Sequence, residues 1–240
     1  MNKNYCLTGR KVIIRRLFKQ DIGDIISCYG KYTNLYHNPI CPAFLENVLL
    51  NGEIWGAFHD DKIIGCCYYF PLNSSFFTSS QFSESLNDFI KETDIYFYMG
   101  YVGIKDSNIP IYENEDSNMP AESGLYQVFL NIAQMQAFRR GLKYIIHCCP
   151  AKFTFPAETL FACGYRLIKL RGLENLVVHY IFAKPVLSEE NIYETDTAYS
   201  PRKIPFDSTK KVSALLENGY CGVDYCKNEN VLLMCRLIAD

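Results

Sequence analysis

The most regular stretch of this 240-residue sequence is a helical pattern of apolar residues that runs from Leu125 to Met135. The basic pair Arg139-Arg140 ends the pattern, and Gly141 follows directly. An apolar stripe, basic residues in the last turn and a glycine after it together predict a helix. Its expected first residue is Ser123 or Gly124.

Strand-like patterns surround this helix on both sides. Residues 95–104 and 143–149 are apolar runs of strand length, which predicts two buried strands. Residues 53–59 and 62–72 are separated only by Asp60-Asp61, which predicts a hairpin with a tight turn. Weaker patterns predict a strand at residues 11–17 and helices at residues 22–32, opened by Asp21 as its N-cap, and at residues 44–50. This order predicts an α/β fold with a mixed, mostly antiparallel central sheet and helices on both faces.

A helix–strand–strand pattern occurs twice, at residues 155–183 and again 55 positions later at residues 210–238. The two copies share a leucine, a Gly-Tyr step at a predicted helix end and a Glu-Asn pair near a predicted turn. The intervening residues 184–209 contain three prolines and are typical of a linker. We therefore predict a main domain at residues 1–186, followed at residues 187–240 by a linker and a C-terminal helix–strand–strand extension.

The composition limits the classes of partner that we expect the protein to bind and the cellular compartment in which we expect it. The formal net charge is −2, from 24 basic and 26 acidic residues, and so gives no basic footprint for nucleic acid or an anionic membrane. The 11 cysteines include no Cys-x-x-Cys pair, which argues against structural zinc and favours free thiols in a reducing compartment. No apolar run has the length of a membrane-spanning helix, and the N-terminus lacks a signal-peptide pattern. We expect a cytoplasmic protein without a metal.

Four short segments, taken in their order along the chain, resemble the GNAT acyl-CoA N-acyltransferase superfamily. They are Lys62-Ile-Ile-Gly65, Tyr101-Val-Gly-Ile104, Gly124-Leu-Tyr126 and Leu160-Phe-Ala-Cys-Gly-Tyr165. The resemblance covers residues 11–186. It implies a GNAT-like fold and acetyl transfer from acetyl-CoA to a primary amine of a small molecule or peptide.

The resemblance also implies where acetyl-CoA binds. In this family the fourth and fifth strands part, and the amides of the pantetheine arm pair with the exposed strand edge. The diphosphate then lies at the N-terminus of the next helix. Residues 119–124 replace the usual Arg- and Gly-rich loop with a segment that has one glycine and no arginine. By resemblance, the cofactor-binding residues are Val102, Gly103, Ile104, Ser123, Gly124, Leu125 and Tyr126.

Catalysis in this family needs an unprotonated amine and a proton donor for the departing thiolate. The donor is commonly a tyrosine four residues before the glycine that ends the last helix, but that position is Leu160 here. The remaining candidates are His147, which titrates near neutrality, and Tyr98 and Tyr101 on the preceding strand. Each of these also fits a role in core packing. Cys148 or Cys149 as a nucleophile is a weaker alternative, because adjacent strand residues point to opposite faces.

Two other functions fit parts of the sequence. A catalytically weak or inactive GNAT-fold protein that binds acyl-CoA or regulates a partner would explain the missing tyrosine and the unusual phosphate loop. Transfer from an aminoacyl-tRNA would need a basic groove, which the net charge of −2 does not favour. The C-terminal extension could lie beside the first sheet, cover a strand edge or exchange between the subunits of a homodimer.

Overall fold

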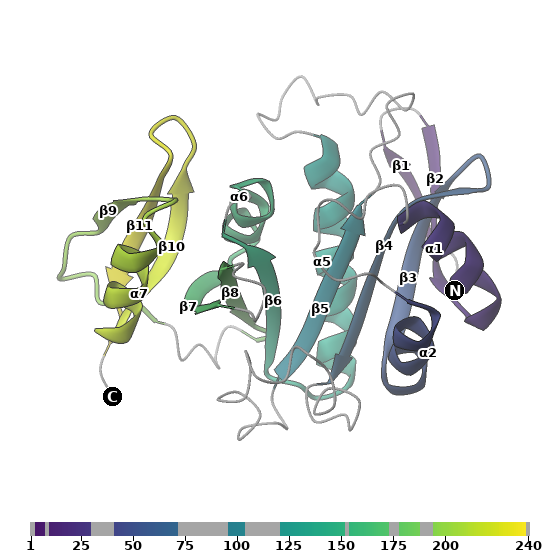
Figure 1. Ribbon diagram of the computed structural model, residues 1–240, viewed down its shortest axis with the longest axis horizontal. Coiled ribbons are helices and arrows are strands. Elements are labelled where there is room, and N and C mark those ends of the chain that lie inside the picture. The colour runs from purple at the N-terminus through teal and green to yellow at the C-terminus, as the bar shows by residue number, and fades with distance from the viewer. Residues whose placement is uncertain are drawn as a thin grey trace. The chain divides into compact units, whose positions relative to one another are not determined.

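A computed structural model describes most of the chain, which divides into two compact units. The first unit is Met1–Ser80 with Tyr98–Ala133, and the second is Gln81–Phe97 with Gln134–Asp240. Figure 1 labels the helices and strands of both units. The described residues are 3–7, 10–29, 41–71, 96–103, 121–151, 154–172, 178–187 and 194–238.

The first unit is built on five adjacent strands. Their order is β1-β2-β3-β4-β5, and β1 to β4 pair antiparallel with their neighbours. The strands are β1 (Lys3–Leu7), β2 (Arg10–Leu17), β3 (Glu53–His59), β4 (Lys62–Pro71) and β5 (Tyr96–Gly103). The strand β1 was not predicted, because residues 1–10 are largely polar and carry no apolar alternation.

The predicted hairpin at Asp60-Asp61 is confirmed. β3 and β4 pair from Glu53 opposite Tyr69 to His59 opposite Lys62. Asp60 and Asp61 have φ angles of 47° and 60°, as a two-residue type I′ turn requires. That turn matches the natural twist of the two strands, so it fixes their register.

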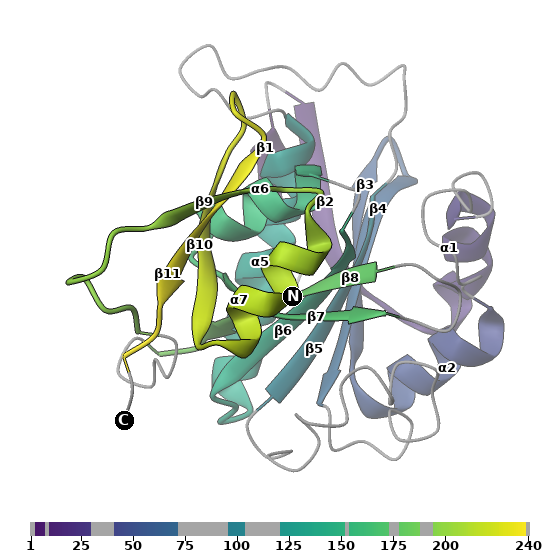
Figure 2. The same ribbon diagram turned by 60° about the vertical axis from the view of Figure 1, so that its left-hand side comes forward.

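Two helices cover one face of this sheet. They are α1 (Ile22–Tyr29) and α2 (Pro42–Asn51), and both contact β4. Figures 1 and 2 show them on one side of β3 and β4, with α5 on the other side. The ring of Phe44 in α2 meets Tyr68 of β4 edge-on, at a centroid distance of 5.2 Å. This packing closes the apolar core on that face.

The turn before α1 differs from the prediction. Asp21 closes a short 3₁₀ helix, Lys19–Asp21, and α1 begins at Ile22 and ends at Tyr29. The Asp21 carboxylate accepts a hydrogen bond from the backbone N–H of Phe18 at 2.8 Å. It also accepts two hydrogen bonds from the Arg15 guanidinium. The prediction that the Asp21 side chain caps α1 was wrong. Arg15 of β2 binds the carboxylate, which therefore lies toward Phe18, before the helix.

The second unit contains six strands in the order β6-β8-β7-β10-β11-β9, all antiparallel to their described neighbours. They are β6 (Tyr144–Pro150), β7 (Arg166–Gly172), β8 (Val178–Pro185), β9 (Arg202–Pro205), β10 (Tyr220–Cys226) and β11 (Val231–Arg236). Its helices are α6 (Thr154–Ala162) and α7 (Thr209–Glu217). The C-terminal part of the chain thus has the helix–strand–strand order that the sequence predicts.

The stretch predicted as a linker contains structure of its own. β9 pairs with β11, from Pro205 opposite Val231 to Arg202 opposite Met234, and Phe206 is buried directly after it. The sequence suggested a linker because of its prolines. Proline is nevertheless compatible with an edge strand, where one side of the backbone needs no partner.

The helix α5 (Ala121–Arg139) contributes residues to both units. It ends as predicted, with Gly141 at a φ of 68° just beyond it, but it begins before the expected Ser123 or Gly124. Pro120, which directly precedes it, is the signal that was overlooked, because proline favours the start of a helix. No helix in the described part of the chain is long and apolar enough to cross a membrane.

Candidate functional site

The predicted pantetheine-binding residues lie at the end of β5. Val102 and Gly103 are its last two residues, while Ile104 lies outside the described residues. Tyr98 and Tyr101 are also in β5, and their side chains fall outside the described part of the structure.

The start of α5 is the predicted diphosphate site. An α-helix leaves the amides of its first turn unpaired, and here these belong to Ala121, Glu122 and Ser123. Among the predicted residues, Ser123 is therefore the one whose amide has no partner within the helix itself. Gly124 comes one position later and is half-buried.

The last two predicted cofactor residues of α5 belong to the core. Leu125 is 9% exposed and Tyr126 is completely buried. Both therefore anchor the start of the helix instead of presenting side chains to a ligand. Within the predicted diphosphate site, this leaves the backbone of the first turn, which includes Glu122.

His147 is the central residue of β6 and is only 4% exposed. It lies directly opposite Phe182 of β8 in an antiparallel pair, so the two side chains share one face. The Phe182 ring meets Phe161 of α6 at 5.1 Å, which identifies this face as the one that α6 covers. His147 thus lies within the packed interior of the second unit.

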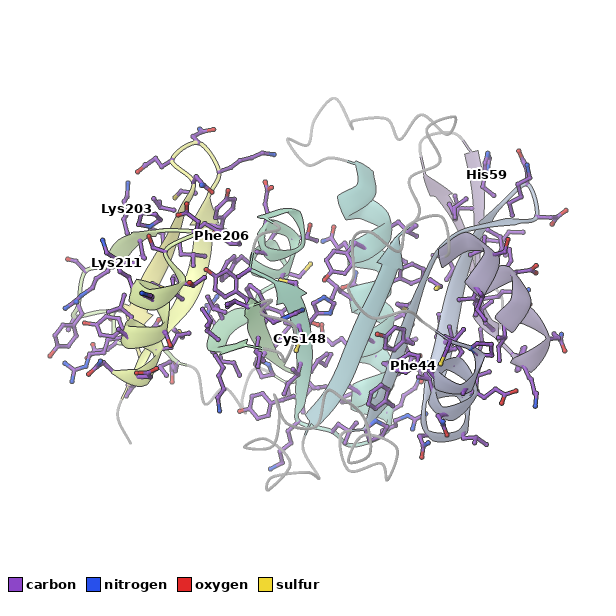
Figure 3. All side chains as sticks on the ribbon, in the orientation of Figure 1. Phe44, His59, Cys148, Lys203, Phe206 and Lys211 are labelled. Carbon is purple, nitrogen blue, oxygen red and sulfur yellow. The ribbon has the colours of Figure 1, made fainter. Side chains whose placement is uncertain are left out.

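The two cysteines that follow His147 are poor nucleophiles. Burial raises the pKa of the Cys148 thiol to about 12 and that of Cys149 still higher. A reactive cysteine needs the opposite shift, because the thiolate is the nucleophile. Cys148 is visible on β6 in Figure 3. The pKa shifts therefore weigh against the cysteine alternative.

The position at which related transferases commonly carry a tyrosine is occupied by Leu160. This residue is fully buried in α6, and Leu215, its counterpart in α7, is half-buried. Neither can transfer a proton. The described residues also contain no group of three or more metal-ligating side chains.

Sequence reasoning missed a buried carboxylate, Glu53, at the start of β3. Its Oε2 accepts hydrogen bonds from Trp55 Nε1 and from the Tyr69 hydroxyl, both at 2.9 Å. The Arg16 guanidinium lies 3.7 Å from Oε1. Burial raises the pKa of Tyr69, so its hydroxyl remains a donor. The available signal was a glutamate on the same strand face as a tryptophan two positions later.

No family model and no curated protein matches this sequence. Solved structures do match its fold. A probable acetyltransferase from Staphylococcus epidermidis has a TM-score of 0.53 and 11% identity, covering 73% of this chain and 99% of its own. An acetyltransferase of the GNAT family from Streptococcus pneumoniae has a TM-score of 0.51 and 14% identity, covering 72% and 98%.

A third neighbour is a putative acetyltransferase from Salmonella typhimurium, solved with its cofactor acetyl-CoA. Its TM-score is 0.51 at 9% identity, and the match covers 74% of this chain and 95% of that one. Identities this low show likeness of fold alone. The chain therefore has the GNAT fold, an α/β architecture of antiparallel strands and helices, as the sequence predicted.

Proposed function

We propose that this chain is an N-acetyltransferase that transfers the acetyl group of acetyl-CoA to a primary amine of a small molecule or peptide. The observation that carries the proposal is the GNAT fold, shared with acetyltransferases at TM-scores of 0.51 to 0.53. The near-neutral charge supports a small or peptide acceptor over a nucleic acid. We also propose that the protein acts in the cytoplasm.

Acetyl-CoA would be held mainly by backbone groups. At the end of β5, Val102 and Gly103 would offer backbone amides and carbonyls to the pantetheine arm, as would Ile104 beyond it. The first turn of α5, with the amide of Ser123, suits the diphosphate. Gly124 adds no side chain beside that turn. The buried side chains of Leu125 and Tyr126 hold the first turn of α5 in place.

The reaction requires two proton transfers. The amine loses a proton as its nitrogen bonds to the acetyl carbon, and the departing sulfur gains a proton as the C–S bond breaks. His147 is the candidate base, and Tyr98 or Tyr101 is the candidate donor to sulfur. Substituting Tyr98 and Tyr101 each by phenylalanine in turn would identify the one that takes part.

Titration calorimetry with acetyl-CoA, followed by an assay for free thiol with a panel of amines, tests the proposal. We expect saturable binding and release of CoA that depends on an amine. His147→Gln should lower kcat while leaving the affinity for acetyl-CoA within a few-fold. Circular dichroism of that variant controls for loss of fold. No binding at millimolar acetyl-CoA would refute the proposal.

A specific observation favours a second function, an acyl-CoA-binding or regulatory protein with little or no turnover. Leu160 is fully buried at the usual tyrosine position, and Glu122 places an acidic residue in the first turn of α5. The same titration separates the two functions. Saturable binding without thiol release from any amine would support this second function.

A further inference from the structure

Two cysteines of the C-terminal hairpin lie directly opposite each other. Cys221 of β10 pairs with Cys235 of β11, so their side chains project from the same face of the sheet. The two strands lie side by side along the hairpin (Figure 2). In the strand pairs whose register is described, no other position sets one cysteine against another. This pairing distinguishes Cys221 and Cys235 from the other cysteines of those strands.

The backbone geometry of this pair suits a disulfide. The Leu237 amide donates a hydrogen bond to the Gly219 carbonyl oxygen at 2.8 Å, and these residues lie two positions from the cysteines in the same register. Cys221 and Cys235 are therefore also a hydrogen-bonded pair, and the Cα atoms of such pairs are about 5.5 Å apart. Disulfides most often join Cα atoms about 5.5–6 Å apart, so the bond can close without a change of register.

The pair also lies where the hairpin can adjust. Cys221 is the second residue of β10, and Cys235 is the second-last residue of β11. A shift in register follows directly, between Gly222 and Asp224. Opposed Cβ atoms in a sheet are about 4.5–5.5 Å apart, whereas a disulfide needs about 3.5–4.5 Å. Strand ends and bulges are the places where a backbone absorbs a movement of about 1 Å with little loss of pairing.

The two thiols differ in their access to solvent. Cys221 is completely buried, and Cys235 is half-buried. A reagent from solvent therefore reaches Cys235 first, and Cys221 is placed to react with the modified sulfur next. Redox-active pairs commonly combine an accessible thiol with a resolving thiol beside it.

Burial and a neighbouring arginine act in opposite directions on these thiols. Burial is the larger effect, and it raises the pKa of Cys221 to about 12 and also raises that of Cys235. The charge of Arg166 favours both thiolates. Arg166 of β7 donates to the carbonyl oxygen of Val223 at 3.4 Å, which places its guanidinium beside β10. The raised pKa values make exchange too slow for catalytic turnover, but the equilibrium depends on how well the two sulfur atoms are placed.

We propose that Cys221 and Cys235 are a redox-sensitive dithiol that low-molecular-weight disulfides oxidise to a cross-strand disulfide. The Cys235 thiolate attacks one sulfur of the small disulfide, whose S–S bond breaks and releases one thiol. The Cys221 thiolate then attacks the Cys235 sulfur, which closes the bond between the two cysteines and releases the second thiol. The cysteines are oxidised, the small disulfide is reduced, and the two cysteine protons pass to the released thiolates. Arg166 assists both steps by favouring the thiolates.

The two forms belong to different conditions. The dithiol fits the reducing compartment that we propose for this protein, and the disulfide forms when that compartment becomes oxidising. The disulfide joins the ends of β10 and β11, so it limits local opening of the hairpin. None of the candidate catalytic or cofactor-binding residues takes part, so the inference is independent of the proposed function.

Oxidised glutathione is the probe that tests this inference in the folded, full-length chain. After alkylation of the remaining thiols and digestion, mass spectrometry should find a cross-link between Cys221 and Cys235 that dithiothreitol reverses. Cys221→Ala should instead keep glutathione on Cys235, because the resolving thiol is absent. Cys226→Ser is the matched control and should cross-link like the wild type, because Cys226 lies in the same strand but opposite Val231.

Two further measurements follow the bond itself. Arg166→Gln should slow formation of the cross-link by about three- to tenfold, because a nearby cation favours the thiolate. Lys169→Gln removes the same charge further along β7 and should slow it less. In the oxidised wild type, amides of β10 and β11 should exchange hydrogen about tenfold or more slowly than in the reduced form. Circular dichroism controls for the fold of each variant, and the wild-type cross-link needs no variant.

Three results would overturn the inference. The first is glutathione on Cys235 of the wild type without a cross-link. The second is a Cys221–Cys235 pair that stays reduced in excess oxidised glutathione. The third is a mixture of cross-links among the 11 cysteines like that of the urea-unfolded chain, because the native pairing would then not direct the bond. An unchanged rate in Arg166→Gln would overturn the role assigned to Arg166.

Discussion

Two buried tyrosines in this protein differ in what their hydroxyl groups contact. The Tyr69 hydroxyl donates to the buried Glu53 carboxylate at 2.9 Å. The Tyr165 hydroxyl is buried and has no hydrogen-bond partner in the described part of the protein. A hydrogen bond to a charged group contributes more than a neutral one, and an unsatisfied buried hydroxyl costs free energy. The two side chains should therefore respond oppositely to loss of the hydroxyl.

We predict that Tyr69→Phe lowers the free energy of unfolding by about 1–3 kcal/mol, because Glu53 loses a donor within the core. Tyr165→Phe should change it by less than about 0.5 kcal/mol or raise it, since no described partner is lost. Urea unfolding of both variants measures the difference. Equal losses for the two would show that ring packing, not the hydroxyl, determines the effect.

Asp21 makes stability depend on pH. Its carboxylate accepts two hydrogen bonds from Arg15, at 2.8 and 3.1 Å, and one from the backbone of Phe18. The hydrogen bonds from Arg15 are the largest cause of the lowered pKa of Asp21, and they outweigh its burial. Because the folded pKa lies below the unfolded one, this carboxylate stabilises the fold above the unfolded pKa. The contribution is lost as the pH falls through the folded pKa.

Accordingly, Asp21→Asn should lower the free energy of unfolding by about 2 kcal/mol at pH 7 and by progressively less below about pH 4. Unfolding midpoints of the wild type and the variant across this range check the convergence. Asp24→Asn, an exposed acid of α1, is the control and should show little difference at any pH. A difference in unfolding midpoint between the wild type and Asp21→Asn that persists at about pH 2 would mean that the charge of the carboxylate does not contribute to stability.

At the scale of elements, the sequence predicted best where several signals coincide. The hairpin at Asp60-Asp61 and the end of α5 at Gly141 each combine an apolar pattern with turn chemistry, and both are present. The 55-residue repeat indicated the helix–strand–strand extension, because a shared glycine marks the same helix end twice. Turns and helix ends of this kind depend on residues that are close together in the sequence, so the local sequence pattern predicts them.

Features that depend on partners distant in sequence were not predictable. β9 is a strand only because β11 offers an edge, and Asp21 turns back because β2 presents Arg15. The Glu53 site likewise needs Tyr69 from the paired strand. Of the elements that carry the candidate site, the pattern predicted strand β5 and helix α5, and both are present. It placed Leu125 in the apolar stripe of the helix and His147 in a buried strand, but it did not indicate that Tyr126 is completely buried, because burial is set by packing of the whole fold.

The start of α5 offers a test that separates a ligand-binding role from a structural one. Glu122 lies in the first turn, where a carboxylate stabilises the helix by about 0.3–1 kcal/mol but repels a bound diphosphate. Glu122→Gln should therefore lower stability slightly while raising the affinity for acetyl-CoA by about two- to fivefold. Calorimetry at low salt measures the affinity, and thermal unfolding measures the stability.

The gain in affinity from Glu122→Gln should shrink as salt is added, because ions screen exposed charges. Glu158→Gln, in α6, removes an acidic residue from a different helix and is the control. Affinity that does not change, or falls together with stability, would mean that the diphosphate does not bind at this turn.

At the scale of the whole molecule, exposed strand edges determine whether separate chains associate. In the second unit the sheet ends at β9, a strand of only four residues. Pro201 directly precedes this strand and Pro205 is its last residue, and its first two residues are the exposed cations Arg202 and Lys203. Short length, proline and positive charge are the features by which proteins prevent edge-to-edge pairing. β9 therefore protects the C-terminal end of the sheet.

We predict that replacing Arg202 and Lys203 together by valine produces concentration-dependent association, because it turns β9 into a neutral, β-prone edge. Static light scattering over a concentration series measures it. Lys210→Val with Lys211→Val removes the same charge from the exposed surface of α7 and should leave the chain far less associated. Because Lys203 also pairs with Glu229 at 2.7 Å, Glu229→Gln is needed as a second control. Association of both double variants alike would assign the effect to net charge. Association of the strand variant together with Glu229→Gln would assign it to loss of the ion pair, and association of the strand variant alone would assign it to the edge.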